Sequence, residues 1–300
     1  MYDFDRYDFG DYVSDYERAT TLASMNENRY LLDDKVVTYL YLTRVGVPTP
    51  TVHGFVHDGR IVWLGSEPPA GGLDGLLERR GELVVKSRSG SGGSGFALLR
   101  REAGITTVNG RTVDDAASTL GGGSLVITDF VRQHDRIAAI YPNSTNTMRV
   151  MTFRDIDTDE PFVAFATHRF GTKRSEPVDN FGAGGLSVGI DLETGVLQQA
   201  LCRLPGAAPG SREIAWIEEH PDTGARITGT KIPGWEDVLD VVLRAAATLP
   251  GSRYVGWDLA ITDDGVSVIE GNNRGDVLVQ MHGPLLVDDR LRKIFAARRR

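Results

Sequence analysis

The chain alternates apolar and polar residues in many short segments, which is the pattern of strands that are buried on one face. The clearest segments lie in pairs around a turn sequence, at residues 52–56 and 61–64, 148–153 and 162–170, 186–191 and 196–202, and 255–261 and 266–270. Further strands flank Asn109-Gly110, a dipeptide typical of two-residue hairpin turns. Because short turns connect these strands, we expect mostly antiparallel sheets and an α+β fold.

Helical spacing is confined to a few stretches. We expect a helix over residues 33–45, where Gly46 and Pro48 follow, and a longer one from Trp235, whose apolar residues recur every three or four positions. A short helix is expected over residues 113–120, and a basic C-terminal one over 290–300. Residues 2–16 repeat Tyr, Phe and Asp with neither the spacing of a helix nor that of a strand, and we interpret them as an N-terminal docking arm.

Composition limits the partners and the compartment. The net charge is −8 and no basic block lies in the interior of the chain, which argues against a nucleic-acid partner. The one cysteine, Cys202, excludes an internal disulfide framework and a cysteine metal site. No apolar run approaches the roughly 20 residues of a membrane span, and the acidic N-terminus does not resemble a signal peptide. We therefore expect a cytoplasmic protein with no membrane partner.

A run of glycine and serine at residues 87–95 follows a short strand that ends at Lys86. Successive backbone N–H groups of such a loop can hold a phosphate, but the composition is equally typical of a flexible surface loop. The spacing of Gly90, Gly92 and Gly95 also occurs in dinucleotide-binding folds, although a charged lysine before the loop does not suit that turn. Lys86 favours phosphate binding, because its ammonium group can reach the same phosphates.

The last pair of strands carries a group of oxygen donors. Asp258 interrupts an apolar strand, and Glu270 and Asn272 share one face of the next strand, roughly 6.6–7 Å apart along the chain. A three-residue turn at 263–265 would place Asp258 opposite Glu270. Two facing carboxylates repel each other unless a cation lies between them, and this donor set suits Mg²⁺. The alternative is a solvated hairpin face with ordinary surface acids, which the apolar surroundings of Asp258 disfavour.

Cations gather on another expected pair of strands. Arg149 lies between apolar residues of one strand, and Arg169 and Lys173 lie on and after the strand that follows it. Asn180 precedes a second glycine run. Positive charge on one sheet could face a triphosphate, although any single arginine of this arginine-rich chain could equally be an ordinary surface residue. Serine, histidine and aspartate occur without the sequence context of a hydrolase triad.

Together these segments resemble the ATP-grasp superfamily. Lys35 in Leu32-Asp33-Asp34-Lys35, Lys86 before the glycine loop, and Asp258 followed by Glu270-Gly271-Asn272 occur in the order typical of that superfamily. Residues 179–186, 220–224 and 231–235 are similar to the sugar-transfer associated ATP-grasp family. The stretch from Arg149 to Gly185 is also similar to ligases that add glutamate to a ribosomal protein.

The resemblance implies an ATP-grasp fold, in which two α+β lobes with mostly antiparallel sheets grip ATP between them. It implies an N-terminal arm with helices at residues 1–50, a small lobe with the glycine loop at 51–133 and a large lobe with the metal site at 134–300. ATP would be held by lysines, by the loop and by the strand end near the adenine: Lys35, Lys86, Ser89, Gly90, Ser91, Gly92, Gly93, Asp129, Phe130 and Val131.

The resemblance also implies roles for the polar residues of the second half. Arg149, Asn180, Lys173 and Arg169 would be the catalytic residues around the transferred phosphate. Asp258, Glu270 and Asn272 would hold one or two Mg²⁺ ions, with Mn²⁺ as an alternative.

The implied activity is that of a carboxylate–amine ligase that forms an acyl phosphate and releases ADP and phosphate. Its substrates would be small molecules, of amino acid or sugar origin, and the family name associates it with polysaccharide chemistry. Two alternatives stay open: a kinase of the same fold that phosphorylates a hydroxyl group, and a non-catalytic nucleotide-binding protein. The sequence also leaves open a homo-oligomer.

Overall fold

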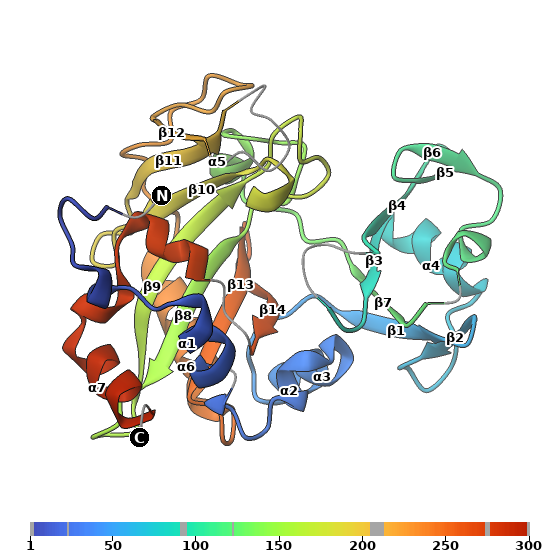
Figure 1. Cartoon of the computed structure of the whole chain (residues 1–300). Helices are drawn as coiled ribbons and strands as arrows, with labels where there is room; N and C mark the ends of the chain where they lie inside the picture. Colours follow the sequence, from blue (N-terminus) through green and yellow to red (C-terminus); the bar gives the residue numbers. More distant parts are fainter. Residues whose placement is uncertain are drawn as a thin grey trace. The chain divides into compact units, whose positions relative to one another are not determined.

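The computed structural model describes residues 3–22, 24–90, 95–121, 123–204, 213–273 and 277–298 (Figure 1). The chain forms two compact units, the smaller made of Tyr30–Val131 and the larger of Met1–Arg29 with Arg132–Arg300. Residues 1–50, expected from the sequence to form one segment, are therefore divided between the two units. Each unit contains a seven-stranded antiparallel sheet, which confirms the α+β fold class.

The smaller unit is built on a sheet with the strand order β2-β1-β7-β3-β4-β5-β6. Its tight turns lie where the sequence predicts them, at Asp58-Gly59 and Asn109-Gly110, and all four residues have a positive φ. The strands are β1 (Val52–His57), β2 (Arg60–Trp63), β3 (Glu82–Ser87), β4 (Ala97–Glu102), β5 (Ile105–Val108), β6 (Arg111–Val113) and β7 (Leu125–Asp129). The helices are α2 (Tyr30–Asp33), α3 (Lys35–Arg44), α4 (Gly72–Arg80) and the 3-10 turn η3 (Ala117–Thr119).

The two faces of this sheet have different surroundings. Val85 and its partner Ile127 face α4 and form an apolar core with Leu76 of that helix. The next pair along the strands, Lys86 and Val126, lies on the opposite face because side chains alternate along a strand. Lys86 is therefore separated from α4 by the sheet.

The larger unit is built on a sheet with the strand order β12-β11-β10-β9-β8-β13-β14. The strands are β8 (Met148–Arg154), β9 (Pro161–Phe170), β10 (Leu186–Ile190), β11 (Leu197–Arg203), β12 (Ile214–Ile217), β13 (Tyr254–Thr262) and β14 (Gly265–Asn272). The helical segments are η1 (Phe9–Asp11), α1 (Asp15–Glu17), η2 (Arg18–Leu22), α5 (Asp135–Ala138), η4 (Phe181–Ala183), α6 (Trp235–Thr248), η5 (Val277–His282), η6 (Leu285–Val287) and α7 (Asp289–Arg298).

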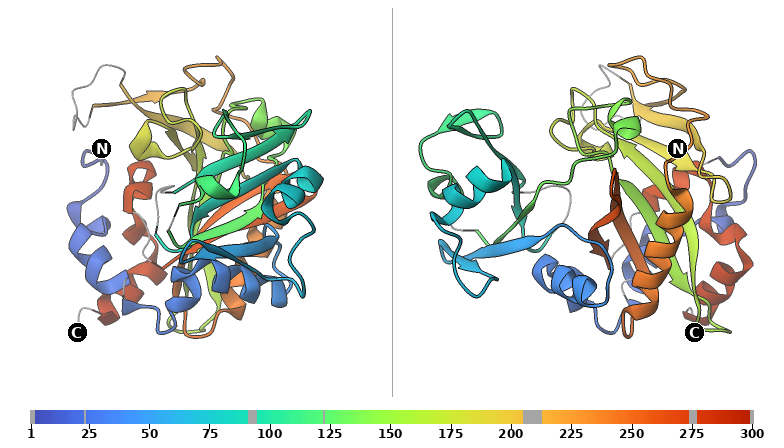
Figure 2. Two further views of the ribbon diagram at one scale, coloured as in Figure 1. Left: turned by 90° about the vertical axis from the view of Figure 1, so that its right-hand side faces the viewer. Right: turned by 180° about the vertical axis from the view of Figure 1, so that it is seen from behind.

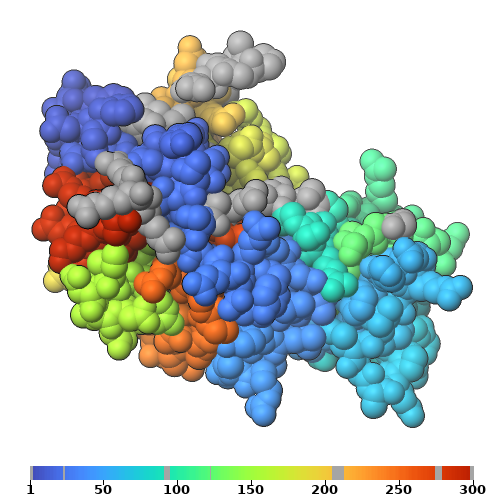
Figure 3. All heavy atoms as spheres, turned by 60° about the horizontal axis from the view of Figure 1, so that its bottom comes forward, coloured from blue at the N-terminus to red at the C-terminus, as the bar shows by residue number. Residues whose placement is uncertain are grey.

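Helices cover both faces of the larger sheet (Figure 2). The amphipathic helix α6, expected from the sequence, packs on β8, β9, β13 and β14. The opposite face is covered at one end by α7 and the N-terminal segments, where Val13, Leu22 and Phe295 join Met151 and Tyr254 in one apolar cluster. Figure 3 shows the N-terminal segment beside α7 on the surface of this unit. The predicted arm thus docks on the chain's own larger unit.

Among the elements that differ from the expectations are a predicted helix that is shorter and a helix that was not predicted. The helix expected over 113–120 shortens to the 3-10 turn Ala117–Thr119, since Val113 belongs to β6. Helix α4 was not anticipated, because Gly72 and Gly75 lower its intrinsic propensity. Gly75 is required by packing: a Cβ atom there would lie 2.0 Å from the carbonyl oxygen of Ala70. In the parts of the chain that the structure describes, no helix is long and apolar enough to cross a membrane.

Candidate active site

Asp258 lies between two partner strands in the larger sheet. It pairs with Arg149 of β8 on one side and with Glu270 of β14 on the other. Paired residues of antiparallel strands point to the same face, so an arginine and two carboxylates share this face on three neighbouring strands. The predicted pairing of Asp258 with Glu270 is confirmed.

The turn behind this pairing differs from the expected three-residue loop. Thr262 pairs with Gly265, so Asp263 and Asp264 alone form the turn. With a two-residue turn alone, every pair of the hairpin would be shifted by one position from the expected register. A bulge between Leu259 and Asp258 adds one residue, Ile269, on β14 and cancels this shift at Asp258. The shorter turn and the bulge compensate each other.

The carboxylate of Asp258 contacts two guanidinium groups. Arg149 Nε lies 2.5 Å from Oδ1 and Arg149 Nη2 donates to Oδ2 at 3.1 Å, while Arg169 Nη2 lies 3.2 Å from Oδ2. All three side chains are largely buried. Burial alone would raise the pKa of Asp258, but the two guanidinium groups outweigh it and lower the pKa to about 2. Asp258 is therefore ionised at neutral pH, and two of the three cations expected from the sequence, Arg149 and Arg169, contact it.

Arg169 is also held by Thr147 and Asp179. Its Nε donates to Thr147 Oγ1 at 3.1 Å and lies 3.6 Å from Asp179 Oδ2. The same Asp179 oxygen accepts from Thr147 N at 2.7 Å and from Thr147 Oγ1 at 2.6 Å. Burial raises the pKa of Asp179, while Arg169 and Thr147 oppose that rise. Thr147 and Asp179 were not among the residues predicted from the sequence, because only the fold brings residue 179 to β8.

Glu270 and Asn272 continue the same face on β14. Asn272 Nδ2 donates to the carbonyl oxygen of Gly256 at 3.1 Å, which orients the amide and leaves Oδ1 as an acceptor. With Asp258 and Glu270, this oxygen forms a donor set that fits a hard cation such as Mg²⁺. In the described part of the chain, no group of three or more His, Cys, Asp or Glu side chains could hold a metal, so such a site needs the Asn272 oxygen.

The other two predicted catalytic residues lie on loops. Asn180 caps η4, and its Oδ1 accepts from Gly182 N at 2.6 Å. Lys173 lies in the turn after β9, where its backbone N–H donates to Asp222 Oδ2 at 2.9 Å and its side chain is exposed. Neither side chain has a described contact with Arg149, Arg169 or Asp258 within the ranges that the structure covers.

A second polar pair lies on the same face, one strand beyond Arg169. Ser187 of β10 pairs with Arg169, and its Oγ lies 2.9 Å from Nε2 of His282, at the end of η5. Burial lowers the pKa of His282 to about 4, so the imidazole is neutral at pH 7. This pair extends the polar face from β14 to β10, and no sequence motif indicated it.

In the smaller unit, one predicted phosphate-binding lysine, Lys86, lies on β3 and contacts α3, and the other, Lys35, contacts the loop after β3. Lys86 Nζ donates to Tyr39 Oη at 2.7 Å, and Lys35 Nζ donates to the carbonyl oxygen of Gly90 at 2.8 Å. Ser89 O accepts from Ser87 Oγ at 2.5 Å. The predicted loop residues Ser91, Gly92 and Gly93 lie outside the described residues.

Asp34 explains why Lys35 begins a helix beside this loop. Its Oδ1 accepts from the backbone of Val36 at 3.0 Å and caps α3, and both its oxygens accept from Arg88 Nε at 2.8–2.9 Å. The backbone N–H of Lys35 in turn donates to the carbonyl oxygen of Arg88 at 3.0 Å. Burial opposes the shift, yet Arg88 and the helix N-terminus lower the pKa of Asp34. A charged cap thus fixes α3 to the end of β3.

Asp129, Phe130 and Val131 form the end of β7 and the segment after it. The backbone N–H of Asp129 donates to Thr51 O at 3.0 Å, and its side chain lies 2.7 Å from His53 Nε2. Because Asp129 pairs with Leu83, its carboxylate lies on the α4 face, away from Lys86. Contacts with an adenine ring would therefore depend on the backbone of Phe130 and Val131.

Comparisons with known proteins give the family and the fold. D-alanyl-alanine synthetase A from Vibrio cholerae has a TM-score of 0.51 at 10% identity, covering 89% of this chain and 64% of that chain. D-alanine–D-alanine ligase from Bacillus anthracis has a TM-score of 0.47 at 14% identity, covering 90% and 69%. N5-carboxyaminoimidazole ribonucleotide synthetase from Thermotoga maritima has a TM-score of 0.46 at 12% identity, covering 88% and 49%.

This chain spans about half the length of the first solved structures that it matches. No curated protein matches it. At 10% identity, the likeness to the Vibrio cholerae protein indicates a shared fold and not a shared substrate. The sugar-transfer associated ATP-grasp family matches residues 17–295, nearly the whole chain. With its two antiparallel sheets and the order of its lysines and acids, the chain belongs to the sugar-transfer associated ATP-grasp family.

Proposed function

We propose that this protein is an ATP- and magnesium-dependent ligase that joins a carboxylate to an amine through an acyl phosphate. One observation carries the proposal: Asp258 and Glu270 face each other on a sheet face that also carries Arg149 and Arg169. Opposed carboxylates beside paired guanidinium groups suit the binding of a metal–triphosphate complex. The solved ligases share the fold, and their substrates are not transferred to this chain.

The cations would bind and orient the triphosphate. In this proposal Lys35 and Lys86 hold phosphate oxygens, together with the glycine loop that begins at Ser89. The backbone at Phe130 and Val131 binds the adenine. Arg149 and Arg169 contact the γ-phosphate, and the loop residues Asn180 and Lys173 are assigned to the same phosphate. These roles follow the family resemblance, supported by the positions of Lys86 at the end of β3 and Arg149 on β8.

Asp258, Glu270 and Asn272 would hold one or two Mg²⁺ ions, for which Mn²⁺ could substitute. The orientation of the Asn272 amide and the shared face support this assignment. When bound, the metal supplies positive charge near the transferred phosphoryl group. Asp258 would share its oxygens between the metal and the arginines that contact it.

In the proposed reaction, a carboxylate oxygen attacks the γ-phosphorus of ATP and the bond to the β-phosphate oxygen breaks. ADP leaves and an acyl phosphate forms. The amine nitrogen then attacks the carbonyl carbon, the carbon–oxygen bond to phosphate breaks, and the amine loses a proton. Arg149 and Arg169 stabilise charge on the phosphoryl oxygens in the first step. The proposed substrates are small amino acid or sugar derivatives that take part in polysaccharide chemistry. We place the reaction in the cytoplasm, and it does not depend on whether the protein is a monomer or a homo-oligomer.

The test offers the purified protein magnesium-ATP with mixtures of amino acids, amino sugars and sugar acids, and identifies products by mass spectrometry. We expect ADP, phosphate and a condensed product, and a hydroxamate when hydroxylamine replaces the amine. The variant Glu270→Gln, assayed beside the wild type, controls for contaminating ATPases. A phosphorylated alcohol without any hydroxamate would identify a kinase, and AMP with pyrophosphate would reject the acyl phosphate.

A further inference from the structure

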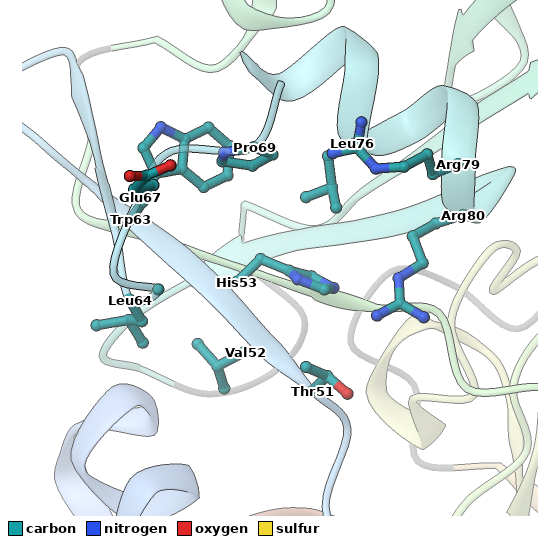
Figure 4. Close-up of a pocket in the computed structure, with 11 residues that line it drawn as sticks. Thr51, Val52, His53, Trp63, Leu64, Glu67, Pro69, Leu76, Arg79 and Arg80 are labelled. Carbon is teal, nitrogen blue, oxygen red and sulfur yellow. The ribbon is translucent and has the colours of Figure 1, made fainter. Parts of the chain in front are cut away.

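The smaller unit contains a hollow that the proposed ligase chemistry does not use (Figure 4). It has a volume of about 600 Å³, which is within the usual range for small-molecule sites. It is lined by the N-terminal end of β1 and the residue before it, the end of β2, the middle and end of α4 and the segment between β2 and α4. Figure 4 shows its labelled side chains arranged around a common space, with Trp63 and Pro69 on one side and His53 and Arg80 on the other.

This hollow lies on the face of the sheet that carries α4. Leu76, one of its lining residues, belongs to the apolar core between α4 and the sheet. Asp129, which contacts His53 and Arg80, pairs with Leu83 and points to that same face. Lys86 points to the opposite face. A ligand in the hollow would therefore be separated by the sheet from a phosphate held by Lys86.

One side of the hollow is cationic. Arg80 Nε lies 3.4 Å from Asp129 Oδ1, and in the described residues this is the one ion pair of its guanidinium group. The Arg80 side chain is 49% exposed, so its other N–H groups remain available to a ligand. Arg79 Nη1 donates to Ala70 O at 3.1 Å, which holds a second guanidinium at the rim. His53 Nε2 lies 2.7 Å from Oδ1 of Asp129. This contact fixes the carboxylate with which Arg80 forms its ion pair.

The other side is apolar and flat. The indole of Trp63 and the ring of Pro69 provide flat surfaces, and Leu76 closes the wall between them and α4. Trp63 is only partly buried, so part of its ring is available for stacking. Glu67 lies beside Trp63 in Figure 4 and offers an acceptor at the apolar end. Aromatic surface opposite guanidinium groups suits a planar ring that carries an anionic group.

We propose that this hollow is a second ligand site, which binds a small molecule with a planar ring at one end and a phosphate or carboxylate at the other. The ring stacks on Trp63, and the anion accepts hydrogen bonds from Arg79 and Arg80. A ring that carries N–H or O–H donors places one of them at Glu67. The site is separate from the nucleotide site of the proposed ligase and does not depend on that function.

Isothermal titration calorimetry of the full chain with simple probes tests the proposal. Nucleoside 5′-monophosphates test a phosphate as the anionic group, and aromatic carboxylates test a carboxylate. Inorganic phosphate supplies the anionic half of the ligand alone, and unphosphorylated nucleosides supply the ring alone. We expect at least one of the two anionic classes to bind, and each half to bind at least about tenfold more weakly than the whole. Arg80→Gln and Trp63→Leu should each weaken that probe by about tenfold, whereas Trp63→Phe retains a ring and should weaken it less.

Two controls separate this site from the nucleotide site. Arg111→Gln removes the same charge from an exposed position on β6, at the other edge of the sheet, and should leave probe binding unchanged. Lys86→Ala should weaken ATP and not the probe. The proposal is overturned if no probe binds, if Arg80→Gln and Trp63→Leu bind it as the wild type does, or if ATP displaces it and Lys86→Ala abolishes its binding.

Discussion

Asp258 faces Glu270 across the β13–β14 ladder, yet its carboxylate is already paired with arginine: Arg149 Nε lies 2.5 Å and Arg169 Nη2 3.2 Å from its oxygens. Removing one partner from a buried ion pair leaves an uncompensated charge, which is more costly than losing the attraction itself. Asp258 therefore has two separable roles in the proposal: it balances two buried cations, and it supplies an oxygen to the metal.

The variants Glu270→Gln and Asp258→Asn should lose activity alike and differ in stability. Each variant removes one negative charge from the proposed metal site, so turnover should fall about 100-fold or more in either. Extra magnesium should restore little of the lost turnover. Asp258→Asn also removes the buried charge that Arg149 and Arg169 both contact and should destabilise the fold by about 3 kcal/mol. Glu270→Gln should melt at the wild-type temperature or above it, because like charges no longer face each other.

Magnesium titrations of turnover and urea unfolding without nucleotide check both halves of this prediction. Asp264→Asn, an exposed acid in the turn of the same hairpin, is the matched control and should resemble the wild type. The double variant should turn over little more slowly than the slower single one, because residues that act as a unit are not additive. Near wild-type turnover in either single variant at saturating magnesium would remove the hairpin as the metal site.

Lys86→Arg should bind ATP about tenfold or more weakly than the wild type, as should Lys86→Ala. The ammonium of Lys86 lies 2.7 Å from Tyr39 Oη, and Tyr39 is almost fully buried. A planar guanidinium is larger and does not replace a compact charge at such a position. Calorimetric titration with magnesium-ATP measures the affinity, and Arg111→Gln controls for a general change of charge. Wild-type affinity in Lys86→Arg would show that this lysine has only a structural role.

Strict alternation and a three-residue turn together predicted that Asp258 and Glu270 face each other, and an error of one residue in either would by itself place them on opposite faces. The turn itself was wrong: it has two residues, and the bulge at Ile269 restores the pairing. A bulge depends on the neighbouring strands and has no reliable local signature. The pairing was therefore correct although one of its premises was not.

Contacts between distant segments were beyond the sequence. Nothing local to Asp179 indicates that its carboxylate contacts Thr147, and Arg169 reaches Asp258 past the intervening strand β8. Helix α4 is stabilised by burial of Leu76 and Leu77, which outweighs the low propensity of its glycines. Such tertiary contacts determine which residues surround the site, and they could not be predicted. The strands that carry the site could be predicted from the local sequence pattern.

His282 should make the stability of the protein fall as the pH drops below about 6.5. Burial lowers its pKa to about 4, so between about pH 6.5 and pH 4 the unfolded chain binds a proton that the folded chain does not. Stability is thus present above the unfolded pKa and is lost toward pH 4, by about 3 kcal/mol. Urea unfolding of the wild type and His282→Gln across this range measures it. The difference between the two should shrink as the pH falls, and a constant difference would contradict the prediction.

Asp179 should act on turnover by positioning Arg169. Its Oδ2 accepts two hydrogen bonds from Thr147, at 2.7 and 2.6 Å, and lies 3.6 Å from Arg169 Nε. Asp179→Asn keeps an acceptor for Thr147 but removes the charge, which leaves Asp258 as the one described carboxylate that contacts Arg169. We expect turnover to fall about 10- to 100-fold, because small displacements of a group that contacts the transferred phosphate are costly.

The affinity for ATP should stay unchanged in Asp179→Asn, since Asp179 has no described contact with Lys35 or Lys86. Turnover and ATP affinity, measured separately with a substrate pair from the product screen, distinguish positioning from a general loss of folding. Asp240→Asn, an exposed acid on α6 paired with Arg244, is the matched control for the lost charge. If Asp179→Asn turns over as fast as the wild type, or loses ATP affinity in parallel with turnover, Asp179 does not position Arg169 for the reaction.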